Sequence, residues 1–181
     1  AKKSARRALS LLMSASGALA LRRGLARSAR VRVLTYHRFG EIARDPFCVS
    51  RADFAAQVRL LADERRAIGL SDLRGFLAGE REIASGSALI TIDDGFESAL
   101  PILRDHAVPA VAFVTANRVG NLAAGEAQPE RYMTWEELGR LAEAGIETGA
   151  HGFEHESLGG LDREAARRIA RGVETGRATI A

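Results

Sequence analysis

Two short motifs hold the residues of this chain that could act together in catalysis. The first is Asp93-Asp94-Gly95, and the second is His151-Gly152-Phe153-Glu154-His155, which places two imidazoles four residues apart. Adjacent carboxylates repel each other unless positive charge lies beside them, and a divalent cation would supply that charge. Two histidines and one carboxylate with an open fourth position form a catalytic zinc site, which leaves the second aspartate free to act as a general base.

Both motifs also have other interpretations. Asp-Gly pairs are common in turns, and a single histidine is more often structural than a metal ligand. The second motif additionally matches H-x-x-E-H, the inverted zinc-protease motif. That motif requires an uninterrupted helix and a further acidic ligand later in the chain, whereas Gly149 and Gly152 flank His151 and the residues before it favour a strand. The protease interpretation is therefore the weaker one.

Alternating strand-like and helix-like segments must position these motifs. Apolar or β-branched runs predict strands buried in a parallel sheet over residues 31–36, 88–92, 109–115 and 146–150. Helices are expected after Ser50, near 98–105, over 135–144 and over 163–173, with Ser50/Asp53 and Thr134/Glu137 as capping boxes. This alternation predicts a parallel α/β fold, either a barrel or a doubly wound sheet.

Three of the four histidines fall close to the ends of predicted strands. His37 follows the first strand, Asp93 and Asp94 follow the second, and His151 follows the fourth. Because the carboxyl ends of parallel strands share one rim, we expect these side chains to lie close together. His106 lies in a helix-to-strand connection on the opposite rim, and we interpret it as structural.

Composition limits the class of protein. A chain of 181 residues is the size of one domain, and its single cysteine, Cys48, excludes an intramolecular disulfide and a cysteine-based zinc site. Residues 1–30 contain eight Lys and Arg and no acidic residue, so subtracting these eight charges from the net +3 leaves −5 for residues 31–181. A mildly acidic domain argues against a nucleic-acid partner.

Residues 1–30 form a basic and apolar leader that precedes the domain expected over residues 31–181. The apolar stretch of the leader, 8–21, is too short to span a bilayer as a helix. Three interpretations stay open: a secretory signal, although Arg22 and Arg23 would hinder export; a basic amphipathic helix in peripheral contact with a membrane; or a poorly ordered tail. The compartment therefore stays open between the cytoplasm or inner-membrane surface and export.

The two motifs resemble those of the polysaccharide deacetylases, the family that includes the chitooligosaccharide deacetylases and the nodulation protein B-like homology domain. Residues 91–95 are similar to the family's Thr-Phe-Asp-Asp-Gly, with Ile92 in place of Phe. Residues 151–155 are similar to its His-(Ser/Thr)-x-x-His, with Gly152 in place of Ser or Thr. The resemblance covers residues 31–181 and implies a distorted (β/α) barrel that hydrolyses N-acetyl groups from N-acetylglucosamine oligomers or polysaccharides.

The resemblance also implies a role for each candidate residue. Asp93 corresponds to the catalytic base, while Asp94, His151 and His155 correspond to the ligands of a divalent metal, commonly zinc. Leu34-Thr35-Tyr36-His37 resembles a feature of poly-N-acetylglucosamine deacetylases, whose circularly permuted barrel begins with the histidine that donates a proton to the leaving amine. His37 is therefore the expected proton donor, and the alternative is that it caps the strand or bonds a loop.

Four predicted strands are too few to close a barrel. We therefore expect this chain to be the N-terminal part of a longer deacetylase domain, so that the barrel within it is incomplete. The alternative to an active deacetylase is a truncated or degenerate domain that binds glycan or metal without catalysis.

Overall fold

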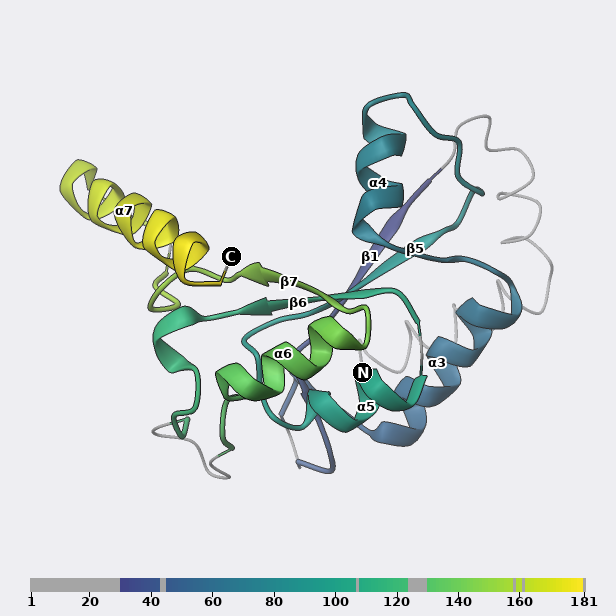
Figure 1. The fold of residues 1–181 in the computed structure, drawn as a ribbon, viewed down its shortest axis with the longest axis horizontal. Coiled ribbons are helices and arrows are strands. Elements are labelled where there is room, and N and C mark those ends of the chain that lie inside the picture. The colour runs from purple at the N-terminus through teal and green to yellow at the C-terminus, as the bar shows by residue number, and fades with distance from the viewer. Residues whose placement is uncertain are drawn as a thin grey trace, which may run out of the picture.

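A computed structural model describes residues 30–42, 45–106, 108–123, 130–157, 159–160 and 162–180. In these residues a twisted parallel sheet is flanked by helices (Figure 1). The strands of this sheet are β1 (Arg32–Tyr36), β4 (Ala67–Ile68), β5 (Ala88–Ile92), β6 (Ala110–Val114) and β7 (Glu147–Ala150). Their order is β1-β5-β6-β7, and β4 pairs with the start of β5. The predicted parallel α/β fold is confirmed, and the described strands form an open sheet, as expected for an incomplete barrel.

Helices connect the strands. They are α3 (Arg51–Asp63), α4 (Leu70–Leu77), α5 (Ala99–His106), α6 (Trp135–Glu143), α7 (Arg163–Ile180) and the short 3-10 helix η1 (Ala116–Arg118). A separate two-stranded parallel ladder joins β2 (Arg38–Phe39) to β3 (Cys48–Val49). Helix α4 and the two-residue strands β2, β3 and β4 were not predicted from the sequence. These strands are too short to show any periodicity. Helix α7 continues to Ile180 rather than ending near 173.

The core lies between the sheet and the helices α3, α5 and α6. All five residues of β5 are buried, as expected for a central strand covered on both faces. Phe54 of α3, Leu103 of α5 and Leu141 of α6 pack into the same cluster as Ile90 and Ile92. The position of β5 therefore fixes where the residues after it emerge, and these residues are Asp93 and Asp94.

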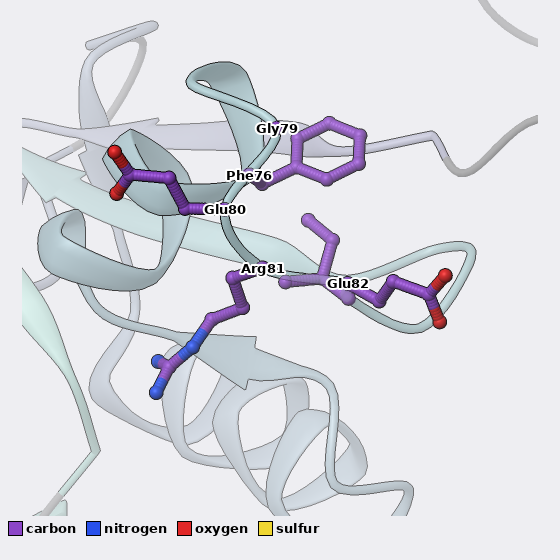
Figure 2. A pocket seen from close by; sticks show the side chains of 6 residues that line it. Phe76, Gly79, Glu80, Arg81 and Glu82 are labelled. Atoms are coloured by element: carbon purple, nitrogen blue, oxygen red, sulfur yellow. The ribbon is translucent and has the colours of Figure 1, made fainter.

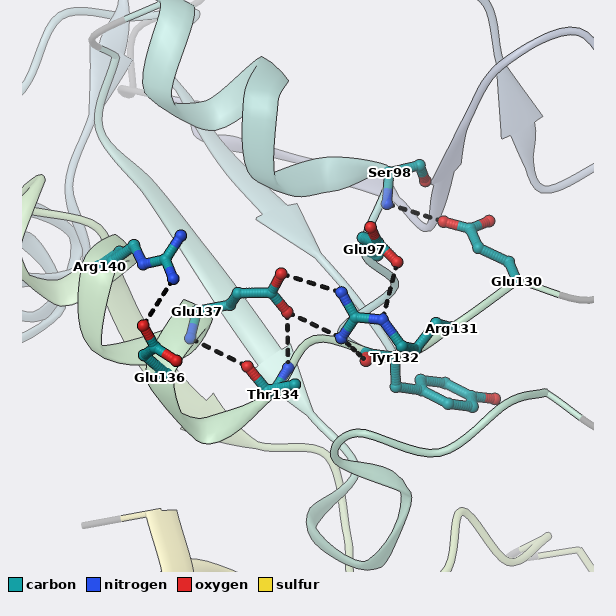
Figure 3. Close-up of polar contacts among 9 residues, drawn as sticks. All are labelled: Glu97, Ser98, Glu130, Arg131, Tyr132, Thr134, Glu136, Glu137 and Arg140. Atoms are coloured by element: carbon teal, nitrogen blue, oxygen red, sulfur yellow. Dashed lines mark hydrogen bonds and ion pairs between the residues drawn. The ribbon is translucent and has the colours of Figure 1, made fainter.

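A polar network fastens the start of α6 (Figure 3). The Thr134 hydroxyl accepts a hydrogen bond from the Glu137 amide, and the Glu137 carboxylate accepts one from the Thr134 amide, which confirms the predicted capping box. The Arg131 guanidinium donates two hydrogen bonds of 2.9 Å to the same carboxylate and also pairs with Glu97 at 3.0 Å. The hydrogen bonds from Arg131 lower the pKa of Glu137 to about 2.

The leader predicted over residues 1–30 falls, up to residue 29, outside the described residues. In the described part of the chain, none of the helices combines the length and the apolar character needed to cross a bilayer. His106 is the last residue of α5 and precedes β6, so the chain passes it on the way to the amino edge of the sheet.

Candidate active site

The candidate residues emerge from one rim of the sheet, as the strand ends predicted. Tyr36 at the end of β1 pairs with Ile92 at the end of β5, and β6 and β7 run parallel to them. Backbone hydrogen bonds continue past the strands. The Asp93 amide donates to the Tyr36 carbonyl at 2.8 Å, and the His151 amide donates to the Val114 carbonyl at 2.7 Å. We call these contacts the exit hydrogen bonds, because each one ties the first residue after a strand to the neighbouring strand.

Asp94, His151 and His155 converge on one point. Asp94 Oδ1 lies 3.1 Å from His155 Nε2 and 3.4 Å from His151 Nε2, and one ligand atom from each residue falls within 4.8 Å of the others. In a tetrahedral zinc site with bonds of about 2.1 Å, neighbouring ligand atoms are about 3.4 Å apart. Asp94 Oδ1 is buried and accepts no hydrogen bond of good geometry from the described residues. These three residues therefore fit a divalent metal.

The backbone at two of these candidate ligands is strained. Asp94 has φ = 71° and His155 has φ = 59°, in the left-handed region that residues with a side chain rarely adopt. Among the described non-glycine residues only Arg65 shares this feature. Such a conformation costs roughly 1–3 kcal/mol per residue and persists where the surroundings demand it, often at functional sites.

Asp93 lies beside the three candidate ligands but outside the cluster that they form. Burial of its carboxyl group raises the pKa of Asp93, and the nearby charges of His151 and His37 act in the opposite direction. A carboxylate whose pKa is raised toward neutrality is suited to accept a proton. The two adjacent aspartates therefore differ in position. Asp94 converges with the two histidines, whereas Asp93 lies beside them with a raised pKa.

His37 is half-buried at the exit of β1, within electrostatic reach of Asp93. Its ring contacts the ring of Phe47 with 4.9 Å between centroids and an angle of 52°. His37 thus lies at the same rim as the three ligands without belonging to the ligand cluster.

The loop that carries both histidines is held by η1. The Ala116 and Asn117 amides donate to the carbonyls of Gly152 and Phe153 at 3.3 and 3.1 Å. Arg118 donates to the Glu154 carbonyl at 3.4 Å and to the Tyr132 hydroxyl at 2.9 Å. The sequence alone assigns no role to Arg118, whose only signal is its place after the third predicted strand.

Helix α7 packs directly against this loop. A Cβ atom added at Gly176 would lie 3.0 Å from the Gly152 carbonyl oxygen, so a side chain at this position would push the helix and the loop apart by a few tenths of an ångström. The loop itself is not helical, and Gly152 has φ = 78°. The inverted zinc-protease interpretation, which requires both histidines on one helix, is therefore wrong.

Two hollows differ in their relation to this site. A cavity of about 310 Å³ lies beside the ligands, between them and α7, and is lined by His151, Phe153, His155, Glu156, Ile169 and Val173. Another hollow, of about 440 Å³, lies between α4 and the segment that leads to β5. Its charged side chains, Glu80, Arg81 and Glu82, point in different directions rather than toward a common centre (Figure 2). Of these two hollows, the first adjoins the candidate ligands.

Comparison with known proteins agrees with this geometry. YxkH of Bacillus subtilis (strain 168), a protein classed with the polysaccharide deacetylases, is 23% identical over 138 residues, which are 74% of this chain and 46% of YxkH. The chain thus spans about half the length of this curated relative. The structure of IcaB from Ammonifex degensii superimposes with a TM-score of 0.72 at 25% identity, covering 84% of this chain and 69% of IcaB.

A second solved structure shares the fold. The Streptococcus pyogenes deacetylase PplD in complex with acetate gives a TM-score of 0.59 at 16% identity, covering 81% of this chain and 70% of PplD. The family model for polysaccharide deacetylase matches residues 81–175, a segment that includes both motifs and more than half of the chain. The chain therefore belongs to the polysaccharide deacetylase family, a family of hydrolases that act on carbohydrates.

Proposed function

We propose that this chain supplies the catalytic centre of a metal-dependent deacetylase that removes N-acetyl groups from N-acetylglucosamine oligomers or polysaccharides. The observation that carries the proposal is the convergence of Asp94 Oδ1, His151 Nε2 and His155 Nε2, with Asp93 beside them. A ligand set of two imidazoles and one carboxylate is typical of catalytic zinc, so zinc is the metal we propose.

The chain's own residues account for the proton transfers. A divalent cation held by Asp94, His151 and His155 would polarise the acetyl carbonyl and acidify water. Asp93 accepts a proton from the attacking water as its oxygen bonds to the carbonyl carbon. His37 donates a proton to the amide nitrogen as the carbon–nitrogen bond breaks. The products are acetate and a free amine on the sugar.

Family membership and the raised pKa of Asp93 support this assignment. PplD, which shares the fold, was solved with acetate, and acetate is the product that the proposed reaction would release. The substrate follows from the resemblance of both motifs to those of deacetylases that act on N-acetylglucosamine polymers.

Acetate release from N-acetylglucosamine oligomers, measured with the zinc-loaded protein, tests the proposal. Release that disappears in the Asp93→Asn variant is the expected result. Binding of oligomers without any acetate release would instead favour a domain that binds glycan without catalysis.

A further inference from the structure

Phe47 presents an aromatic ring to solvent beside the proposed proton donor. The residue is 58% exposed, which is unusual for an aromatic side chain, and its ring packs against the ring of His37. The ring of Phe47 thus contacts His37 on one side, while much of its surface remains accessible to a ligand.

The backbone of Phe47 is anchored rather than loose. The Phe47 amide donates to Asp45 Oδ1 at 2.8 Å, and the Phe47 carbonyl accepts from the Arg38 amide at 3.2 Å. Asp45 also pairs with the Arg38 guanidinium at 3.4 Å, and that guanidinium is buried over the ring of Phe96. An anchored backbone leaves only the two side-chain torsions of Phe47 to be ordered when a ligand binds to its ring.

We propose that the exposed ring of Phe47 is a platform on which a pyranose ring of the substrate stacks beside His37. This inference rests on the proposed function and names the part of the substrate that the site recognises. A glucosamine-type ring carries its substituents equatorially, so its two faces present C–H groups. Such C–H groups pack favourably on the negative face of an aromatic ring. The site therefore selects sugars with an apolar face, in addition to the acetamido group.

The test measures binding in an Asp93→Asn background, where oligomers bind without turnover. Titration calorimetry with N-acetylglucosamine tetramer gives Kd for this parent and for added substitutions at Phe47. We expect Phe47→Ala to raise Kd by roughly tenfold and Phe47→Trp to keep it within about twofold, because only the second retains an aromatic face. Phe47→Leu keeps an apolar side chain without an aromatic face, so its Kd should rise almost as much as that of Phe47→Ala.

Leu60→Ala is the matched control, because Leu60 on α3 is also 58% exposed. Its Kd should equal that of the parent. Saturation transfer by NMR supplies a second readout: irradiating the aromatic protons of the protein should transfer saturation to sugar ring protons, and Phe47→Leu should reduce this transfer.

Equal Kd values for Phe47→Ala and the parent would overturn the platform, as would a Phe47→Leu variant that binds like the parent. A lower kcat in otherwise wild-type Phe47→Ala at unchanged Kd would also overturn it, since Phe47 would then act only by holding His37. Failure of the proposed function looks different: the wild-type zinc-loaded protein would release no acetate, whatever residue stands at position 47.

Discussion

Asp94 Oδ1 and His155 Nε2 lie 3.1 Å apart, and the backbone of both residues is in the left-handed region. Each residue reaches this point from a different loop, one after β5 and the other after β7. A cation bound to both side chains would offset this strain, because binding to a site that only the folded chain possesses adds to the free energy of folding. Metal binding should therefore stabilise the fold as well as supply chemistry.

The two neighbouring aspartates should respond differently to substitution. Asp94→Asn removes a charged ligand atom and should weaken zinc binding, whereas Asp93→Asn should retain about one zinc per chain and lose activity. Elemental analysis of the purified variants, combined with acetate release, separates the two effects.

The double variant His151→Ala/His155→Ala should hold no zinc. Unchanged zinc content in this double variant would show that the two histidines do not bind the metal. At the aspartates, the reverse pattern would show that Asp93 is the ligand and Asp94 the base.

His37 should affect turnover but not metal content. His37→Ala removes the proposed proton donor and should lower kcat by roughly 10²–10⁴-fold, the usual contribution of one general acid. Zinc content should stay at the wild-type level, because His37 is not part of the ligand cluster. Near-normal turnover would show that another group protonates the amine.

Arg118 should hold the histidine loop in place. It bonds the Glu154 carbonyl between the two histidines, so Arg118→Ala should raise the Kd for zinc by roughly tenfold, the lower end of what supporting groups contribute. Competition with a chromogenic chelator measures this affinity. Arg104→Ala is the control, since Arg104 is exposed and pairs only with its neighbour Asp105 among the described residues. An unchanged Kd in Arg118→Ala would show that the loop holds its shape without this contact.

Glu137 should make stability depend on pH under acidic conditions. Its pKa is about 2 in the folded chain against an ordinary value of 4.5, so protons bind the unfolded state more readily. The stabilisation is complete above about pH 4.5 and is lost as the pH falls toward 2. Urea unfolding across this window should show a shallower decline in Glu137→Gln than in wild type. An equal decline in the two proteins would show that the contacts of Glu137 do not cause the loss of stability.

The elements with strong local signals were predictable from sequence. The apolar run of β5 matches its burial on both faces, and the Thr134/Glu137 pair forms the capping box that its spacing predicts. The meeting of Asp94 and His151 was also predictable, because parallel strands bring their carboxyl ends to one rim.

Other features depend on contacts between distant residues and had no local signal. The left-handed backbone of His155 is set by its loop, and the glycine at position 176 matters because α7 packs against Gly152. Phe47 and Arg118 resemble ordinary surface residues in the sequence. Their places beside His37 and Glu154 emerge only when the β1 exit and η1 are assembled around the sheet.

The exit hydrogen bonds divide the chain into parts that can change independently during evolution. The contact of Asp93 with Tyr36 ties the residue after β5 to β1, and the contact of His151 with Val114 ties the residue after β7 to β6. Asp94 and His155 follow these anchors by only one and four residues, so loop segments farther along the chain can vary without moving these side chains. We therefore expect relatives of this protein to differ in these outer segments while the positions of Asp94 and the two histidines stay the same.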